Sequence, residues 1–413
     1  MKKFTKLSLV AAVAVAGLSS ANAKPLEEAI KDVEVSGSVV YRYNDNKAKN
    51  PSTNTENADA DNNYKVGLNL SSKVNDYVKF NSRFIVGGDD SGFAGPLDTS
   101  SANDKNVNVT LSHAYFALTA IPNTTVNVGK QGLTTPWTVA IDSDGAEQTG
   151  TGVLALTTVG PVTAAAGYFN QTNLDKSGDT IVKSANGTFG QHGSKDIAVG
   201  ALIANFEPVT IDAWYLNMSD VFDTFSLSAT SKLELSEDAK IGLEARYVQL
   251  NLDKNVADTL ATIPVLDRNN EDKNSMYRLA VDGKVGIVNA KVSYTSTDKK
   301  GGLTALDKDA KNTTLGWNLT SLDTFDADYW QVVVGVDLLD NLNLSANYGN
   351  LKHKSGNIAT ADTLKDQEYY AQLTYNMSKN LTTYVRYGKL EEKENGTKVA
   401  DDTVGRLQVE YRF

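Results

Sequence analysis

Apolar and polar residues alternate at every second position along most of this chain, and this pattern restricts its fold more than any other feature. Period-2 alternation is typical of β-strands that have two different faces. It recurs in 18 segments, whereas long helical periodicity does not occur. The predicted strands are residues 33–45, 62–72, 76–87, 108–119, 123–131, 150–158, 160–170, 194–206, 208–217, 224–235, 238–251, 273–284, 285–297, 326–338, 340–351, 366–378, 380–391 and 402–413.

The connections between these segments differ in length according to a simple rule. Links after even-numbered segments are short, and links after odd-numbered segments are usually long, with residues 218–223 as the exception. Short turns on one side and long loops on the other are the signature of outer-membrane barrels. Residues 311–319 also resemble a strand, but counting them would give an odd number, so we place them as a small hairpin within a long external loop. The sequence therefore predicts an all-β, transmembrane, antiparallel β-barrel of about 18 strands.

Alternation also assigns the two faces of each strand. In the last segment Leu407, Val409 and Tyr411 share one face, and Arg406 and Gln408 share the other. A barrel of about 18 strands encloses a lumen too wide for side chains to fill. We therefore expect the apolar faces to contact lipid and the polar faces to line water. Tyrosines near the segment ends predict aromatic girdles at both membrane interfaces.

The N-terminus has the features of an export signal. Lys2, Lys3 and Lys6 precede an apolar run over residues 7–18, and a small-residue cleavage site follows at residues 21–23. This pattern predicts a signal peptide over residues 1–23 and one barrel domain over residues 24–413, located in the outer membrane of a Gram-negative bacterium. Without those three lysines, 37 basic residues face 50 acidic ones, a net charge of −13. Such a balance disfavours nucleic-acid binding and suits the attraction of cations.

Residue types that support catalysis form no convincing constellation. There is no cysteine, and the three histidines, His113, His192 and His353, have no metal-ligand spacing. We therefore predict that the chain is not an enzyme and requires no cofactor.

The loop after the fifth segment, residues 131–150, is unusual because it is rich in apolar residues such as Leu133 and Trp137. We expect it to fold into the barrel and pack against the wall. Its acids are Asp142, Asp144 and Glu147, and carboxylates at a constriction favour cations. The alternative is a solvated, acidic external loop.

Basic residues on the polar faces complete the predicted lumen. A charged side chain facing lipid at mid-membrane costs about 2–4 kcal/mol, so arginines within strands should point inward. We assign to the constriction Lys130, Arg42, Arg83, Arg246, Arg278, Arg386 and Arg406, and to the lumen wall also Lys65, Lys79 and Lys291. Some of them could oppose the loop acids and create a transverse field. Alternatively, they pair with wall acids such as Glu34, Glu244 or Asp282 and only stiffen the barrel.

Two stretches resemble a known family. Residues 24–33 (KPLEEAIKDV), 35–37 (VSG) and 41–43 (YRY) resemble the mature start of the Campylobacter-type, epsilon-proteobacterial major outer membrane porins. Residues 129–131 (GKQ), 137–138 (WT), 140–142 (AID) and 150–152 (GTG) resemble the family's segment leading into its inward third loop. The chain also ends with Tyr411 and Phe413, and a terminal aromatic residue is typical of substrates of the outer-membrane barrel assembly machinery.

The resemblance implies a homotrimeric porin through which ions and small hydrophilic solutes diffuse passively, with a preference for cations. Its expected partners are outer-membrane lipid, lipopolysaccharide and the assembly machinery. It also implies a calcium ion at the constriction, for which Asp142 lies on a matching motif position and Asp144 is a second candidate. Two alternatives stay open: a substrate-selective outer-membrane channel, and a barrel that acts as a surface adhesin or structural anchor.

Overall fold

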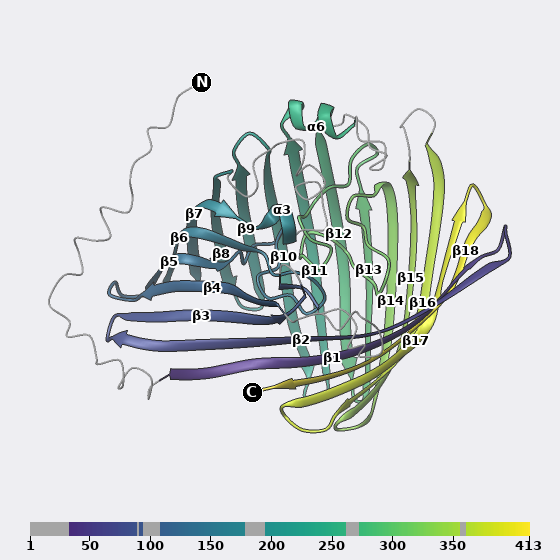
Figure 1. Ribbon diagram of the computed structural model, residues 1–413, viewed down its shortest axis with the longest axis horizontal. Helices are drawn as coiled ribbons and strands as arrows, with labels where there is room; N and C mark the ends of the chain where they lie inside the picture. The colour runs from purple at the N-terminus through teal and green to yellow at the C-terminus, as the bar shows by residue number, and fades with distance from the viewer. Residues whose placement is uncertain (1–32, 89–90, 94–107, 178–194, 262–271, 356–360) are drawn as a thin grey trace.

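The computed structural model describes residues 33–88, 91–93, 108–177, 195–261, 272–355 and 361–413. It is a closed antiparallel barrel of 18 strands, in which each strand pairs with its sequence neighbours and β1 pairs with β18 (Figure 1). The predicted signal peptide lies outside the described residues. The strands are β1 (Val33–Asn50), β2 (Thr55–Asn75), β3 (Val78–Gly87), β4 (Asn108–Leu118), β5 (Thr124–Gly132), β6 (Thr149–Val159), β7 (Val162–Thr172), β8 (Ile197–Phe206), β9 (Val209–Met218), β10 (Phe222–Ser236), β11 (Ala239–Leu252), β12 (Lys273–Val285), β13 (Val288–Thr297), β14 (Phe325–Leu339), β15 (Leu342–Ser355), β16 (Asp362–Asn376), β17 (Leu381–Glu394) and β18 (Thr397–Arg412).

The predicted number of strands is confirmed, and most boundaries agree to within a few residues. The main difference concerns two hairpins, β1–β2 and β17–β18, which continue well beyond the predicted strands to turns at residues 51–54 and 395–396. The prediction of loops there was wrong because these extensions are polar on both faces. Strands that rise above a membrane meet water on both sides and lose the alternation that reveals them.

Closure of the barrel depends on the seam between the first and last strands. Ten residue pairs join β1 to β18, from Ser38 opposite Arg412 to Lys47 opposite Thr403. Gly37 and Phe413 extend the seam, with backbone hydrogen bonds of 2.8 and 3.1 Å between them. Because lipid offers no hydrogen-bond partner to the backbone, only a sheet without edges is stable within the membrane.

The outer face is apolar, as predicted. Its large exposed side chains include Leu344, Leu373 and Val385, with Tyr348 and Tyr369 nearer the long-loop end. The described helices, α3 (Leu174–Ser177) and α6 (Lys254–Leu260), are short. Within the described residues, none has the length and apolar character needed to cross a bilayer.

The inner face departs from the prediction in one region. Where β7 to β12 approach the long loops, the inward side chains are apolar and fully buried, including Phe169, Leu216, Val248 and Leu250. The expectation that inward faces are polar throughout was therefore wrong here. Alternation locates two faces but cannot tell whether lipid or a folded loop covers an apolar one. In this barrel two loops fold inward and form a hydrophobic core with the wall.

This core predicts different effects for two similar substitutions. Leu250→Ala removes a fully buried side chain from the core and should weaken its packing by about 2–5 kcal/mol. Leu373→Ala, at the lipid-facing surface, is the matched control and should have little effect on the loops. Limited proteolysis of the folded barrel in detergent measures loop release. Equal protection of the loops in both variants would contradict the assigned core.

Candidate functional site: two inward loops facing a basic wall

Two loops occupy part of the lumen. The β5–β6 loop (residues 133–148) and the β13–β14 loop (residues 298–324) contact each other directly. The backbone N–H of Leu306 donates to the carbonyl of Trp137 at 2.8 Å, and that of Asn312 donates to the carbonyl of Pro136 at 2.9 Å. The side chain of Gln148 also donates to the carbonyl of Leu306 at 3.0 Å. The two loops therefore form one unit inside the barrel.

The β5–β6 loop folds inward, as predicted. The β13–β14 loop also folds inward, and this was not predicted. We expected the second loop to be external, yet its Leu303 and Leu306 are buried in the core shared with Trp137. Residues 311–319 belong to this loop and not to the barrel wall, and a single bridge between Leu315 and Thr320 closes a small hairpin. The signal that identified the first loop, apolar residues inside a long connection, was also present here.

Glu147 fixes the first loop to the wall. Its carboxylate is fully buried and accepts hydrogen bonds from the guanidinium of Arg83 on β3, with contacts of 2.6 to 3.0 Å, and from the hydroxyl of Ser112 on β4 at 2.6 Å. A buried carboxylate is stable only when it is paired and hydrogen-bonded, and this one is both. Glu147 is thus a structural anchor with no side-chain surface exposed to the lumen.

Asp144 lies between two arginines of the opposite wall. It forms an ion pair with Arg42 on β1 and a longer one, 3.7 Å, with Arg406 on β18. Burial by itself raises the pKa of Asp144, but these two guanidinium groups outweigh it and hold the pKa below its ordinary value. Asp144 therefore stays ionised down to acidic pH and joins the loop to the basic wall.

The pKa of Asp142 is shifted in the opposite direction from that of Asp144. Burial raises the pKa of this carboxyl group above its ordinary value, even though the backbone N–H of Asp144 donates to it at 2.6 Å. Its second oxygen, Oδ2, is buried without a hydrogen-bond partner among the described residues. Lys65 on β2 lies beside it but donates to the backbone carbonyls of Asp142 and Gly145, at 2.6 and 2.9 Å.

The second loop brings two further acids to this carboxylate. Oxygens of Asp142, Asp307 and Asp309 lie within 4.8 Å of one another. Sequence reasoning missed Asp307 and Asp309, because only the contact between the two loops places them beside Asp142. Asp144, the other predicted metal ligand, lies outside this group and is engaged by Arg42 and Arg406.

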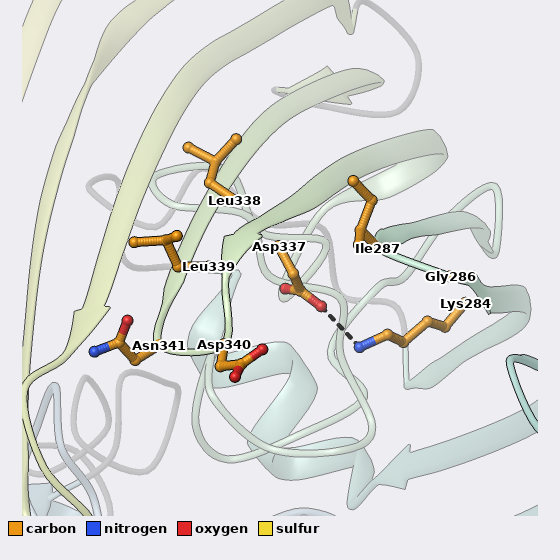
Figure 2. Close-up of a pocket in the computed structure, with 8 residues that line it drawn as sticks. All are labelled: Lys284, Gly286, Ile287, Asp337, Leu338, Leu339, Asp340 and Asn341. Atoms are coloured by element: carbon orange, nitrogen blue, oxygen red, sulfur yellow. Dashed lines mark hydrogen bonds and ion pairs between the residues drawn. The ribbon is translucent and has the colours of Figure 1, made fainter.

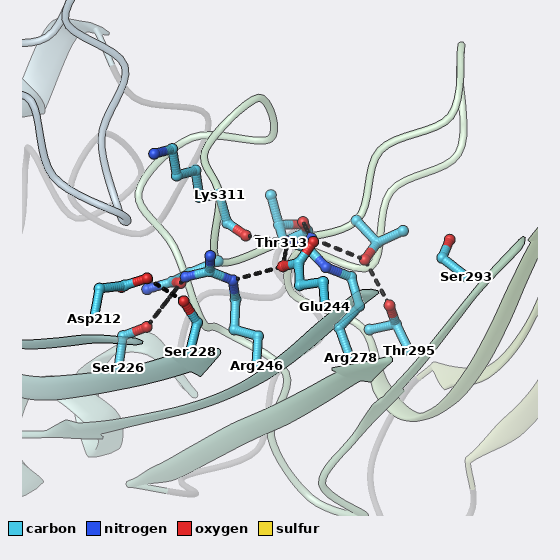
Figure 3. A network of polar contacts seen from close by, with 12 residues as sticks. Asp212, Ser226, Ser228, Glu244, Arg246, Arg278, Ser293, Thr295, Lys311 and Thr313 are labelled. Atoms are coloured by element: carbon cyan, nitrogen blue, oxygen red, sulfur yellow. Dashed lines mark hydrogen bonds and ion pairs between the residues drawn. The ribbon is translucent and has the colours of Figure 1, made fainter. Parts of the chain in front are cut away.

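Arg246 and Arg278 hold the second loop from the other side (Figure 3). They lie directly opposite each other on β11 and β12, and Glu244 bridges them at 3.0 and 2.6 Å. Arg246 donates to the side chain of Asn312 at 3.1 Å, and Arg278 donates to the carbonyl of Lys311 at 3.0 Å. These two arginines thus position the loop, and they share one wall carboxylate, that of Glu244.

The hairpin at residues 315–320 is held by Glu368 on β16, another residue that sequence reasoning missed. This buried carboxylate accepts hydrogen bonds from three successive backbone N–H groups, those of residues 317, 318 and 319, at 2.9, 2.8 and 3.3 Å. A Cβ atom at Gly316 would lie 1.6 Å from the Glu368 carboxylate, so this position requires glycine. These contacts place the centre of the Trp317 ring 5.0 Å from the guanidinium carbon of Arg386 and 5.7 Å from that of Arg406, in cation–π geometry.

Lys130 does not lie at the constriction, so its predicted position in the lumen was wrong. The register places it opposite Ala114 on the same face as Val128 and the exposed Phe116, so it lies on the outer surface of the barrel. Its ammonium group donates to the carbonyl of Leu111 at 2.7 Å, next to a register shift between β3 and β4. The inward residue at this point of β5 is the adjacent Gln131, which is buried.

A pocket at the short-turn end of the barrel lies apart from this site (Figure 2). It is lined by the β12–β13 and β14–β15 turns, including Ile287 and Leu339, and by the ion pair between Lys284 and Asp337 at 2.7 Å. Its residues belong to these turns and to the adjoining strand ends, away from the two inward loops, so we assign no role in permeation to it.

The closed barrel, with loops folded inward against charged wall residues, defines the protein as an outer-membrane channel. The model of the Campylobacter major outer membrane protein family matches residues 1–413, the whole chain. The chain therefore belongs to this family and to the outer membrane of a Gram-negative bacterium. A search of curated protein sequences finds no match.

Similar solved structures have the same fold at low sequence identity. OccAB1 of Acinetobacter baumannii has a TM-score of 0.69 and 14% identity, over 96% of this chain and 99% of that one. OpdL of Pseudomonas aeruginosa has a TM-score of 0.69 and 15% identity, over 93% and 99%. OpdK of the same organism, in a structure with vanillate, has a TM-score of 0.66 and 12% identity, over 92% and 98%.

The Glu368 contact predicts the behaviour of the hairpin. Glu368→Gln replaces the carboxylate with an amide that has one acceptor oxygen and would turn N–H donors toward the loop, which costs about 3 kcal/mol of loop anchoring. We expect a folded barrel whose single-channel current shows added noise and partial closures. Glu56→Gln, at an exposed position of β2, is the control and should leave the current quiet. A quiet Glu368→Gln channel would contradict the anchoring role.

Proposed function

We propose that the protein is a water-filled channel through which ions and small hydrophilic solutes diffuse passively. The observation that carries this proposal is the character of the inner wall below the loops. There the inward side chains of Lys79, Asp282 and Lys291 are charged and exposed to solvent. Charged, hydrated side chains inside a membrane barrel are stable only beside water.

We further propose a preference for cations, set by acids near the external entrance. Asp366 on β16 lies directly opposite Glu392 on β17, and Asp402 follows on β18, all on the inward face. Asp366 is bonded to His353 at 2.9 Å, which leaves Glu392 and Asp402 as the less neutralised pair. Carboxylates at a pore entrance raise the local concentration of cations and lower that of anions.

Neutralising these two acids should reduce the selectivity. In Glu392→Gln/Asp402→Asn we expect the cation-to-anion permeability ratio to fall by about twofold or more, with similar conductance at high salt, where charges are screened. The ratio comes from the reversal potential of single channels in a planar bilayer under a salt gradient. The control, Glu34→Gln/Glu237→Gln, changes the same charge at exposed positions of the short-turn end, away from this entrance. An unchanged ratio in the first variant would contradict the entrance acids as its cause.

The family resemblance implies a calcium ion, and the residues present fit one. Asp142, Asp307 and Asp309 supply carboxylate oxygens, the donors that calcium prefers. The unpaired Oδ2 of Asp142 is the group that a cation would satisfy. Bound calcium would neutralise these acids and tie the β5–β6 loop to the β13–β14 loop. This assignment replaces Asp144 with Asp307 and Asp309.

Calcium should therefore stabilise the loops in a manner that depends on pH. Because burial raises the pKa of Asp142, protons compete with the ion above the ordinary carboxyl range, and binding should weaken as the pH falls through that raised pKa. We expect calcium to raise the melting temperature of the wild-type protein at neutral pH, and chelation to lower it. Asp142→Asn/Asp307→Asn should remove the response, whereas Glu56→Gln should retain it. A full response in the double variant would contradict the site.

One observation favours a second candidate, a channel selective for anionic organic solutes. Arg386 on β17 is directly opposite Arg406 on β18, and both side chains are only partly buried. Such a pair could guide carboxylates past the loops. Liposome swelling rates for neutral and anionic solutes of equal size separate the two candidates, since only selective uptake of the anions supports the second.

The expected partners remain proposals of the same kind. Family membership supports a homotrimer, contact with lipopolysaccharide and insertion by the outer-membrane barrel assembly machinery. Tyr411 and Phe413, the predicted assembly signal, lie at the seam with their rings stacked at 5.8 Å.

A further inference from the structure

A row of lysines crosses the outer face of the barrel near its external end. Lys352 on β15 lies directly opposite Lys365 on β16, Lys365 lies opposite Lys393 on β17, and Lys393 lies opposite Lys398 on β18. The strands are about 4.8 Å apart, so the row extends over about 14 Å. Like charges directly opposite each other destabilise a sheet. Four such lysines in succession therefore require an explanation.

The row faces away from the lumen. Lys365 shares the face of Tyr369, which is exposed, whereas the intervening Asp366 and Glu368 are buried on the inward face. On β15, Lys352 shares the face of the exposed Tyr348. Each lysine lies four residues beyond its tyrosine toward the long-loop end. That distance is about 13 Å along the strand, or about 10 Å in height for a tilted strand.

Neighbouring lysines in this region have acidic partners. Lys354 pairs with Asp326 at 3.5 Å, Lys389 pairs with Asp401 at 3.2 Å, and Lys398 pairs with Glu391 at 3.1 Å and with Asp401 at 3.4 Å. Lys352, Lys365 and Lys393 differ from them. Among the residues that the structure describes, these three have no ion-pair partner in the protein. The carboxylates nearest to this lysine patch are engaged by other groups: Asp328, opposite Lys352 on β14, accepts from the hydroxyl of Tyr294, and Glu391 and Asp401 pair with Lys389 and Lys398.

We propose that Lys352, Lys365 and Lys393 bind the phosphate groups of a glycolipid of the outer leaflet. The aromatic residues mark the membrane interface, and the lysines lie just beyond it, at the level of lipid headgroups. The patch is on the membrane side of the wall, so its occupant is a lipid and not a permeating solute. Its length suits a headgroup that carries more than one phosphate. Such a lipid would remove the repulsion within the row and attach the long hairpins to the membrane surface.

This inference rests on the proposed orientation, with the long loops outside, but it does not depend on ion selectivity. The experiment measures binding of bisphosphorylated lipid A to the folded barrel in detergent by native mass spectrometry. Lys352→Gln/Lys365→Gln/Lys393→Gln should bind about 100-fold more weakly, because each lysine near an anionic surface contributes about a tenfold factor at most. The matched control, Lys240→Gln/Lys284→Gln/Lys379→Gln, removes the same charge at the short-turn end and should bind like the wild type.

Two further arms identify the ligand chemistry. Dephosphorylated lipid A should bind the wild type poorly, and phosphatidylglycerol should compete only weakly. Equal binding by the lysine-row variant, equal binding of dephosphorylated lipid A, or preferential binding of phosphatidylglycerol would each overturn the proposal. Heat-modifiable migration confirms that each variant is folded, and the single-lysine variant Lys365→Glu provides a second test by charge reversal. The row variant should keep wild-type single-channel conductance, so a failed channel proposal is distinguishable from a failed lipid site.

Discussion

Within lipid every backbone N–H and C=O group must be paired inside the protein, and this requirement determines the architecture of the barrel. The β1–β18 seam meets it by joining the two ends of the sheet. Once the barrel is closed, its outer surface must be apolar and its interior is separated from the lipid. A lumen enclosed by 18 strands is wide. The protein fills part of that width with two of its own loops.

The two loops are held by different interactions on different sides. Toward β7–β12 they pack mainly through apolar side chains, with hydrogen bonds from Arg246 and Arg278, and toward β1–β3 and β18 they pair through charges. This division explains how one loop unit can be anchored firmly while it presents carboxylates to a basic wall. Glu147 and Glu368 serve as buried anchors, since each carboxylate is saturated by donors from a second element. The charges available to a permeating ion are therefore fewer than the sequence suggests.

The alternation of apolar and polar residues was sufficient to predict most of the barrel. Alternation gave the strands because every membrane-spanning strand has one face toward lipid and the other toward the lumen. It failed for the outer part of β1–β2, where both faces meet water, and for the inner face of Val248 and Leu250, which a loop covers. For Lys130 the assumed alternation was wrong by one residue, which is enough to place the side chain on the outer surface and not in the lumen.

The site was less predictable because it depends on contacts between distant segments. Gln148 and Leu306 are 158 residues apart and meet only because both loops fold inward. The grouping of Asp142 with Asp307 follows from that contact and from no spacing in the sequence. Similarly, the ion pairs of Asp144 with Arg42 and Arg406 join a loop to both strands of the seam.

The β13–β14 loop folds into the lumen together with the β5–β6 loop, and it should narrow the path of a permeating ion. Single-channel conductance tests this in a variant in which residues 303–322 are replaced by a short flexible linker. We expect a folded, heat-modifiable barrel with a conductance clearly larger than that of the wild type, because the loop no longer narrows the path. A folded barrel with unchanged conductance would show that this loop does not line the path.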